Sequence, residues 1–249
     1  IASLSVEYRS PAFLELARIC FRGKDLAAAM QYAGKCLVYN QLNLDAWQLE
    51  ATIYRLQNDQ QNAMRVLDKL LGMDPLSHFA AFEKYRWNRA GEKAFQDGIK
   101  NELPSETYLD LGIWYAQLGL RDDARKVFAL APLTAEIRYW KAFLEDKPVE
   151  IINPEPGTAF PYRAETAAML GELIKRNSDW HLKYQLALIW WNRNQPEKAK
   201  ELFSACGSEP DYTAFYAAKA SLFPAEEESD LKRARSMDRE QWRYAKLLT

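Results

Sequence analysis

The feature that most constrains the fold is a self-similarity in which positions 34 residues apart can be aligned. The matched pairs near the start are Phe13 with Trp47, Ala17 with Ala51, Cys20 with Tyr54, Ala29 with Ala63, Cys36 with Leu70 and Gln41 with Pro75. The same series returns as Tyr108, Leu111, Gly112, Tyr115, Gly119, Ala124, Phe128 and Ala131, and as Lys183, Leu186, Ala187, Trp190, Asn194, Ala199, Phe203 and Cys206. A fixed period of this length is the signature of a repeat array.

Large and small residues alternate within each copy for a packing reason. We expect Gly112 and Ala124 to lie where two helix backbones cross closely, because a larger side chain there would hold the helices apart. Tyr108, Tyr115 and Phe128 then fill the space on either side. Among the helix boundary signals, Ser105 and Asp122 are expected as N-caps, and Pro196 in the first turn of a helix.

This pattern resembles the tetratricopeptide repeat, in which two antiparallel helices span about 34 residues. The resemblance implies an all-α fold, a right-handed superhelical solenoid of antiparallel helix pairs forming one domain over residues 1–249. We predict about seven repeats. They are expected at 10–43, 44–77, 78–104 (shortened and degenerate), 105–133, 134–177 (with a loop insertion at 146–161), 178–211 and 212–238, with a partial repeat at 239–249.

The C-terminal part carries a second resemblance. The segment from "IINPEPGTAFPYRAET" to "DYTAFYAAKASLF" is similar to the repeat region of large bacterial proteins whose N-terminal portion is a β-rich domain of unknown function. Such proteins are suspected of handling carbohydrate or assembling envelope components. This chain shows no part of that domain, so the resemblance transfers no activity to it.

The balance of charge argues against a nucleic-acid partner. Lys and Arg number 33, and Asp and Glu number 34, so no excess of positive charge is available to release counterions from a phosphate backbone. No run approaches the roughly 18 apolar residues of a membrane-spanning helix. We therefore expect neither a nucleic-acid partner nor a membrane span.

The cysteines and the chain ends bear on the origin of the protein. Cys20, Cys36 and Cys206 lie far apart without a CxxC spacing, which argues against a disulfide framework or a zinc site and suits a reducing compartment. The cytoplasm is therefore favoured over a bacterial periplasm. Because the chain starts at Ile1 and stops inside the helical pattern "WRYAKLLT", we expect it to be a piece of a longer protein.

No catalytic signature stands out. His78 and His181 are the only histidines and neither belongs to an HExxH motif; nucleotide-binding and acyl-transfer motifs are also missing. The acidic run from Glu226 to Asp230 precedes the helical pattern "LKRARSM", where acids favour the positive end of the helix dipole. We expect no catalytic residue, no cofactor and no metal ligand in this chain.

The insertion at 146–161 leaves two interpretations open. Pro148, Pro154, Pro156 and Pro161 exclude a helix, while Ile151, Ile152 and Phe160 provide apolar surface. The loop either packs back on its own repeats or contacts a ligand or another domain.

The resemblance also implies where a partner would bind, because the first helices of the repeats line a concave groove. The Lys and Asn residues that bind acidic peptide C-termini are absent, since the corresponding positions hold Leu14 and Arg18, then Gln48 and Thr52. In the sixth repeat they hold Tyr184 and Leu188, with Trp191 at the helix end. We predict these three as partner-binding residues, with Arg18 and Arg55 as weaker polar candidates. Trp190 is expected inside the packing layer and Trp191 in the groove.

The sequence thus predicts a protein–protein interaction scaffold that binds a peptide, a helix or a neighbouring domain of the same chain in its groove. The alternative is an accessory repeat domain of a larger carbohydrate-active bacterial enzyme, which mediates domain docking or dimerisation. A homodimer is left open.

Overall fold

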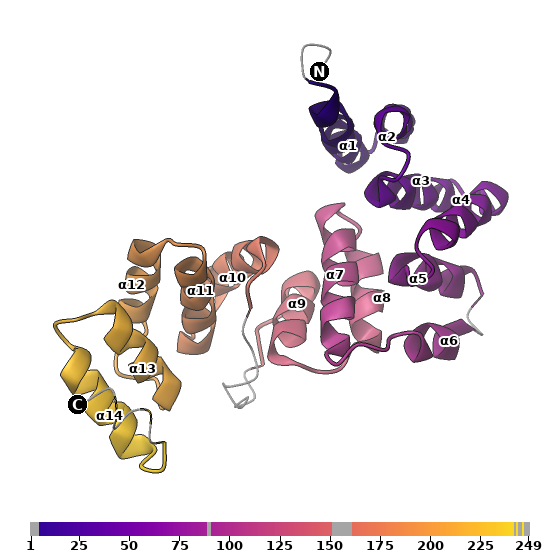
Figure 1. The fold of residues 1–249 in the computed structure, drawn as a ribbon. Helices are drawn as coiled ribbons and strands as arrows, with labels where there is room; N and C mark the ends of the chain where they lie inside the picture. Colours follow the sequence, from indigo (N-terminus) through magenta and orange to yellow (C-terminus); the bar gives the residue numbers. More distant parts are fainter. Residues whose placement is uncertain (1–4, 89–90, 151–160, 242, 244–245, 247–249) are drawn as a thin grey trace. The chain divides into compact units, whose positions relative to one another are not determined.

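The computed structural model describes residues 5–88, 91–150, 161–241, 243 and 246. The described residues form fourteen helices and no strand, which confirms the predicted all-α fold (Figure 1). The chain divides into two compact units, Ile1–Leu130 (unit 1) and Ala131–Thr249 (unit 2). A single solenoid over the whole chain stays a prediction.

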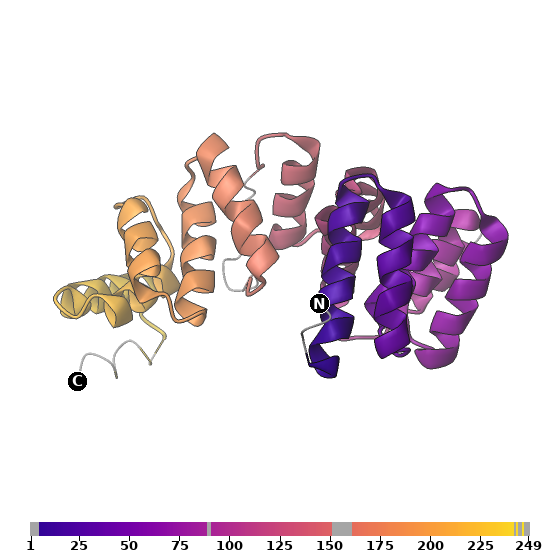
Figure 2. The same ribbon diagram turned by 90° about the horizontal axis from the view of Figure 1, so that it is seen from above.

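Unit 1 contains four helix pairs. Their bounds are α1 (Val6–Arg22) with α2 (Leu26–Tyr39), α3 (Leu44–Leu56) with α4 (Gln60–Met73), α5 (His78–Trp87) with α6 (Glu92–Asp97), and α7 (Pro104–Gln117) with α8 (Arg121–Leu130). Each pair packs on the next, through α2 on α3 and α4 on α5, with α5 on α7. Figure 2 shows the first helices of this unit, in indigo and purple, side by side. Packing between neighbours along the chain is that of a helical solenoid.

Unit 2 contains three further pairs. Their bounds are α9 (Ala135–Glu145) with α10 (Ala164–Arg176), α11 (Trp180–Asn192) with α12 (Pro196–Ala205), and α13 (Thr213–Leu222) with α14 (Glu227–Met237). Residues 151–160 of the predicted insertion, and most of the predicted partial repeat at 239–249, lie outside the described residues. None of the helices that the structure describes is long and apolar enough to span a membrane.

In four of the seven pairs that the structure describes, one repeat position sets the turn between the helices. Lys24, Asn58, Gly119 and Asn194 stand at equivalent places and have φ values of 65°, 58°, 80° and 56°. Glycine and asparagine adopt this left-handed conformation most readily. The sequence series therefore includes Gly119 and Asn194 because the backbone reverses there.

Helix starts follow the same periodicity. Asp25, Asn43, Asp59 and Ser77 each accept a hydrogen bond from the backbone N–H three residues further on, which satisfies a free donor of the first turn. Pro196 begins α12 as predicted. The prediction for Ser105 was wrong, because α7 already begins at Pro104 and its N-cap is Leu103.

The close approach expected at Gly112 is present in unit 1. A Cβ atom at this position would lie 2.3 Å from Cζ of Phe128 on α8. Ala124, Tyr115 and Phe128 are fully buried around it. The glycine therefore lets the Phe128 ring lie directly on the backbone of α7.

Candidate functional site

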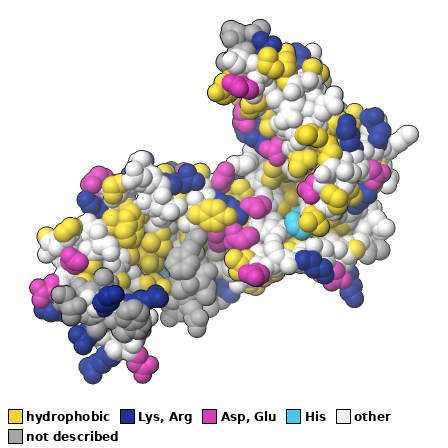
Figure 3. All heavy atoms as spheres, viewed as in Figure 1, with side chains coloured by type: hydrophobic (Ala, Val, Ile, Leu, Met, Phe, Trp, Pro, Cys, Tyr) yellow, Lys and Arg dark blue, Asp and Glu magenta, His cyan; other side chains and the backbone are white. Residues whose placement is uncertain are grey.

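The first helices of the pairs in unit 1, α1, α3, α5 and α7, line the inner side of its arc in Figure 1. We call this surface the concave face of unit 1. It contains a pocket of about 220 Å³ between α3, α5 and α7. The pocket is lined by Gln48, His78, Phe79, Thr107, Asp110, Leu111 and Trp114. Figure 3 shows apolar side chains inside the hollow of this unit.

This pocket has an aromatic wall and a polar rim. The rings of Phe79 and Trp114 meet edge to face with their centroids 4.9 Å apart. Thr107 is buried and its hydroxyl accepts a hydrogen bond of 2.6 Å from Asn101. Gln48 and His78 are half-buried, on α3 and α5. An apolar side chain fits against the aromatic wall, while amide and imidazole groups lie within reach of a peptide backbone.

Arg18 lies on α1 and is held by two acids. Its guanidinium lies 2.6 Å from Glu15 Oε1 and 2.6 Å from Asp45 Oδ2. Asp45 belongs to α3, so the second contact joins the first two repeats. The predicted role of Arg18 in partner binding stays a prediction.

Arg55 lies in a buried charge cluster, so the expectation that it faces an open groove needs correction. Its Nε is 2.8 Å from Glu83 Oε2 and its Nη2 is 2.6 Å from Asp123 Oδ2. Arg86 Nη1 lies 2.8 Å from Asp123 Oδ1, and the Tyr115 hydroxyl donates to Glu83. These side chains come from α3, α5, α7 and α8, so the cluster joins three consecutive helix pairs.

The environment shifts the pKa values in this cluster. Burial raises the pKa of Glu83, although Arg55 and the Tyr115 hydroxyl act against it. Burial acts on Asp123 as well, but the hydrogen bond from Arg86 and the charge of Arg55 outweigh it and lower the pKa of Asp123. Burial and the neighbouring Glu83 raise the pKa of Tyr115, which keeps the phenol protonated as a donor.

Tyr184 is in the core of unit 2, which corrects the expectation of an exposed aromatic patch. Only 4% of this residue is exposed. Its ring centroid lies 5.7 Å from that of Phe203 on α12, 5.5 Å from that of Phe215 on α13 and 6.0 Å from that of Tyr212. The physical reason is that α13 and the residue before it cover this side of α11.

Leu188, Trp190 and Trp191 are all half-buried against the same core. The Trp191 and Phe203 rings lie 6.5 Å apart, edge to face, and Lys198 Nζ lies 4.4 Å from the centroid of Trp190. The expected contrast between a buried Trp190 and an open Trp191 is therefore not found. Partner binding by Leu188 and Trp191 stays a prediction.

Substitution of Tyr184 separates a core role from a binding role. We expect Tyr184→Ala to lower the free energy of unfolding by about 3 kcal/mol, because it leaves a cavity among aromatic rings. Tyr162→Ala, at a tyrosine that is 51% exposed, is the matched control and should change stability by about 0.5 kcal/mol or less. Urea unfolding measures both, and equal small effects would contradict the core assignment.

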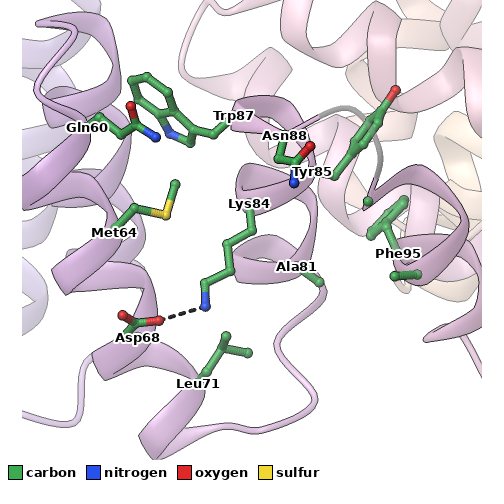
Figure 4. Close-up of a pocket in the computed structure, with 12 residues that line it drawn as sticks. Gln60, Met64, Asp68, Leu71, Ala81, Lys84, Tyr85, Trp87, Asn88 and Phe95 are labelled. Atoms are coloured by element: carbon green, nitrogen blue, oxygen red, sulfur yellow. Dashed lines mark hydrogen bonds and ion pairs between the residues drawn. The ribbon is translucent and has the colours of Figure 1, made fainter.

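A second pocket, which the residue pattern did not predict, lies between α4, α5 and α6 and has a volume of about 610 Å³. We call it the α4–α5–α6 pocket. One wall is a stripe on α4, Gln60, Met64, Asp68 and Leu71. Figure 4 shows Trp87 of α5 beside Gln60 and Met64, and Phe95 on the α6 side. The Trp87 indole N–H is buried with no hydrogen-bond partner among the described residues.

Two of the three cysteines lie in the packed interior. Cys36 and Cys206 are buried, and burial raises the pKa of Cys206 to about 12. Within the described ranges, no group of three or more His, Cys, Asp and Glu side chains could hold a metal ion.

Residues 44–75 match the family model of the tetratricopeptide repeat. This segment, which holds α3 and α4, is similar to a tetratricopeptide repeat. The predicted resemblance is confirmed for these residues. The second resemblance, to larger bacterial proteins, stays a prediction, as does the accessory-domain alternative.

Alignments with several solved structures extend over nearly the whole chain, with low sequence identity and low TM-scores. A protein from Parabacteroides merdae is 17% identical, with 97% of this chain and 98% of that chain covered and a TM-score of 0.35. A thermophilic protein from Thermus thermophilus is 14% identical, with 96% and 98% covered and a TM-score of 0.30. MamA from Desulfovibrio magneticus is 12% identical, with 94% and 97% covered and a TM-score of 0.30. A comparison with curated proteins gives no match.

Proposed function

We propose that the chain is an interaction scaffold and that unit 1 binds an extended peptide segment of a partner protein along its concave face. The observation that carries this proposal is the pocket of about 220 Å³ formed jointly by α3, α5 and α7. Three consecutive repeats contribute to it, so a linear segment that follows the face from one repeat to the next can insert a side chain there.

The lining favours an apolar side chain in the pocket. Phe79 and Trp114 offer aromatic surface, and Leu111 is buried beside them. Gln48 and Thr107 stand where the peptide backbone would pass, and backbone groups that lose water need such partners. Arg18 is engaged by Glu15 and Asp45, so the ligand is not recognised through a C-terminal carboxylate at this arginine.

A random peptide display library, panned against the full chain, tests the proposal. We expect enriched peptides to bind the unchanged protein and to lose affinity by about tenfold or more when Gln48→Trp fills the mouth of the pocket. Gln61→Trp is the matched control, because Gln61 is exposed on α4 and does not line this pocket. It should change Kd by about twofold at most.

Two outcomes would contradict the proposed site. Peptides that bind Gln48→Trp as tightly as the unchanged protein do not use the concave face of unit 1. A library that yields no enriched peptide argues against a peptide ligand altogether. The melting temperatures of both variants show whether each has kept its fold.

A further inference from the structure

The α4–α5–α6 pocket exists because large and small residues exchange places in the third repeat. The first helix of the fourth repeat carries Tyr108 at its leading large position and Gly112 at its small position. The equivalent residues of α5 are Ala81 and Tyr85. In α5 the small residue Ala81 therefore stands at the position of Tyr108, and Tyr85 stands at the position of Gly112.

This exchange keeps the second helix of the repeat away from the first. At Gly112 the Phe128 ring lies within 2.3 Å of where a Cβ would be. At Tyr85 that space is filled by the tyrosine side chain, and its ring stacks on Phe95 of α6 with the centroids 6.4 Å apart. A helix cannot approach α5 here as α8 approaches α7.

The second helix is also too short to cover its partner. α6 has six residues, about 9 Å of helix, whereas the stripe from Gln60 to Leu71 on α4 runs for about 16 Å. Ala81 and Lys84 of α5 therefore line an open pocket. In the neighbouring repeats the equivalent face is covered by a full helix, α4 on α3 and α8 on α7.

We propose that the α4–α5–α6 pocket binds an amphipathic α-helix of a partner protein, which occupies the space that the shortened α6 leaves open. The walls suit its apolar side chains. Met64 and Leu71 stand seven residues apart on one side of α4, so a facing helix meets them about two turns apart. Trp87 and Phe95 complete the apolar lining.

The charged side chains of the pocket limit which residues the partner helix can present on its docking face, the side that enters the pocket. Lys84 Nζ lies 2.6 Å from Asp68 Oδ1, and Figure 4 shows this ion pair joining α5 to α4 across the pocket. The pair is neutral as a whole. An uncharged apolar stripe leaves it intact, whereas a charged residue on the docking face would compete for one of its members. The partner chemistry is therefore an uncharged apolar stripe on a helix of about three turns.

A display library of stapled helices tests the proposal with the full chain. Each helix has about eleven residues, which matches the α4 stripe, and four positions on one face are randomised. We expect enriched helices with apolar residues at i, i+3 or i+4, and i+7. Leu71→Glu should weaken their binding by about tenfold or more, because it places a charge in the pocket. Leu76→Glu is the matched control, since Leu76 is 77% exposed and outside the pocket; it should change Kd by about twofold at most.

A spectroscopic readout locates the bound helix. The protein is labelled with 5-fluorotryptophan, and the ¹⁹F resonance of Trp87 is assigned as the one that is lost in Trp87→Phe. We expect this resonance to shift when an enriched helix is added. Ala81→Trp, which fills the pocket from α5, should abolish that binding while the melting temperature confirms folding. Gln48→Trp should leave helix binding unchanged, so this site and the concave face of unit 1 are tested separately.

Three results would overturn the proposal. In the first, the library yields no enriched helix. In the second, enriched helices bind Leu71→Glu and Ala81→Trp with the same Kd as the unchanged protein. In the third, a helix binds but the ¹⁹F resonance of Trp87 does not shift. Each of them leaves the peptide proposal for the concave face intact.

Discussion

Gly112→Leu is expected to lower the free energy of unfolding by about 4 kcal/mol, because the new side chain overlaps a buried ring that cannot move away. The first added atom would already lie 2.3 Å from Cζ of Phe128 and 2.6 Å from its Cε1. Phe128 is fully buried, so relief requires α7 and α8 to separate. Urea unfolding followed by circular dichroism measures the loss.

The matched control is the same exchange at Gly34 in α2. A Cβ at Gly34 meets nothing within 4 Å, and leucine is a better helix former than glycine by about 0.8 kcal/mol. Gly34→Leu should therefore leave stability unchanged or raise it slightly. A similar loss at both glycines would show that the close approach of α7 and α8 is not the cause.

The second large effect is expected at the buried charge cluster. Arg55→Met should lower the free energy of unfolding by about 4 kcal/mol, because it leaves Glu83 and Asp123 buried with less positive charge beside them. Glu83 is 1% exposed and Asp123 is 6% exposed. Arg125→Met is the control, since its pair with Asp122 is on the surface and is worth about 0.5 kcal/mol or less.

The pH dependence of this loss follows from the same contacts. Arg55 lowers the pKa of both acids, so its removal raises their pKa values in the folded protein. The loss concerns only the ionised form of each acid, because a protonated carboxyl carries no charge for Arg55 to pair with. The cost of Arg55→Met should thus be largest near neutral pH and shrink as the pH falls through the folded pKa values of the two acids and they become protonated. A cost that is independent of pH would indicate lost packing instead of lost charge pairing.

Residue spacing was sufficient to predict the helix pairs and their closest contact. The 34-residue period placed Gly112 at a close crossing, because helices that cross closely need a small residue there. The structure adds that the atoms Gly112 meets belong to the Phe128 ring. The acidic run before "LKRARSM" was also assigned correctly, since Glu227, Glu228 and Asp230 lie in the first turn of α14. These features depend on neighbours within one repeat.

The candidate binding residues could not be predicted in the same way. Tyr184 stands at a groove position of its own helix, yet Phe215 of the following pair packs on it. Arg55 likewise occupies such a position but pairs with acids from α5 and α8. The spacing within a repeat specifies which way a side chain points. Whether another helix covers it depends on the next repeat.

The sequence by itself determined the repeat, the helix pairs and the residues at their crossings, because those are local packing constraints that recur every 34 positions. Only the tertiary structure decided which surfaces stay open. The exchange of Ala81 and Tyr85 was visible in the sequence, but its result, a pocket of about 610 Å³, depends on how far α6 extends and on the facing wall of α4. Whether a side chain is exposed depends on several helices packed together, so the sequence of its own helix does not specify it.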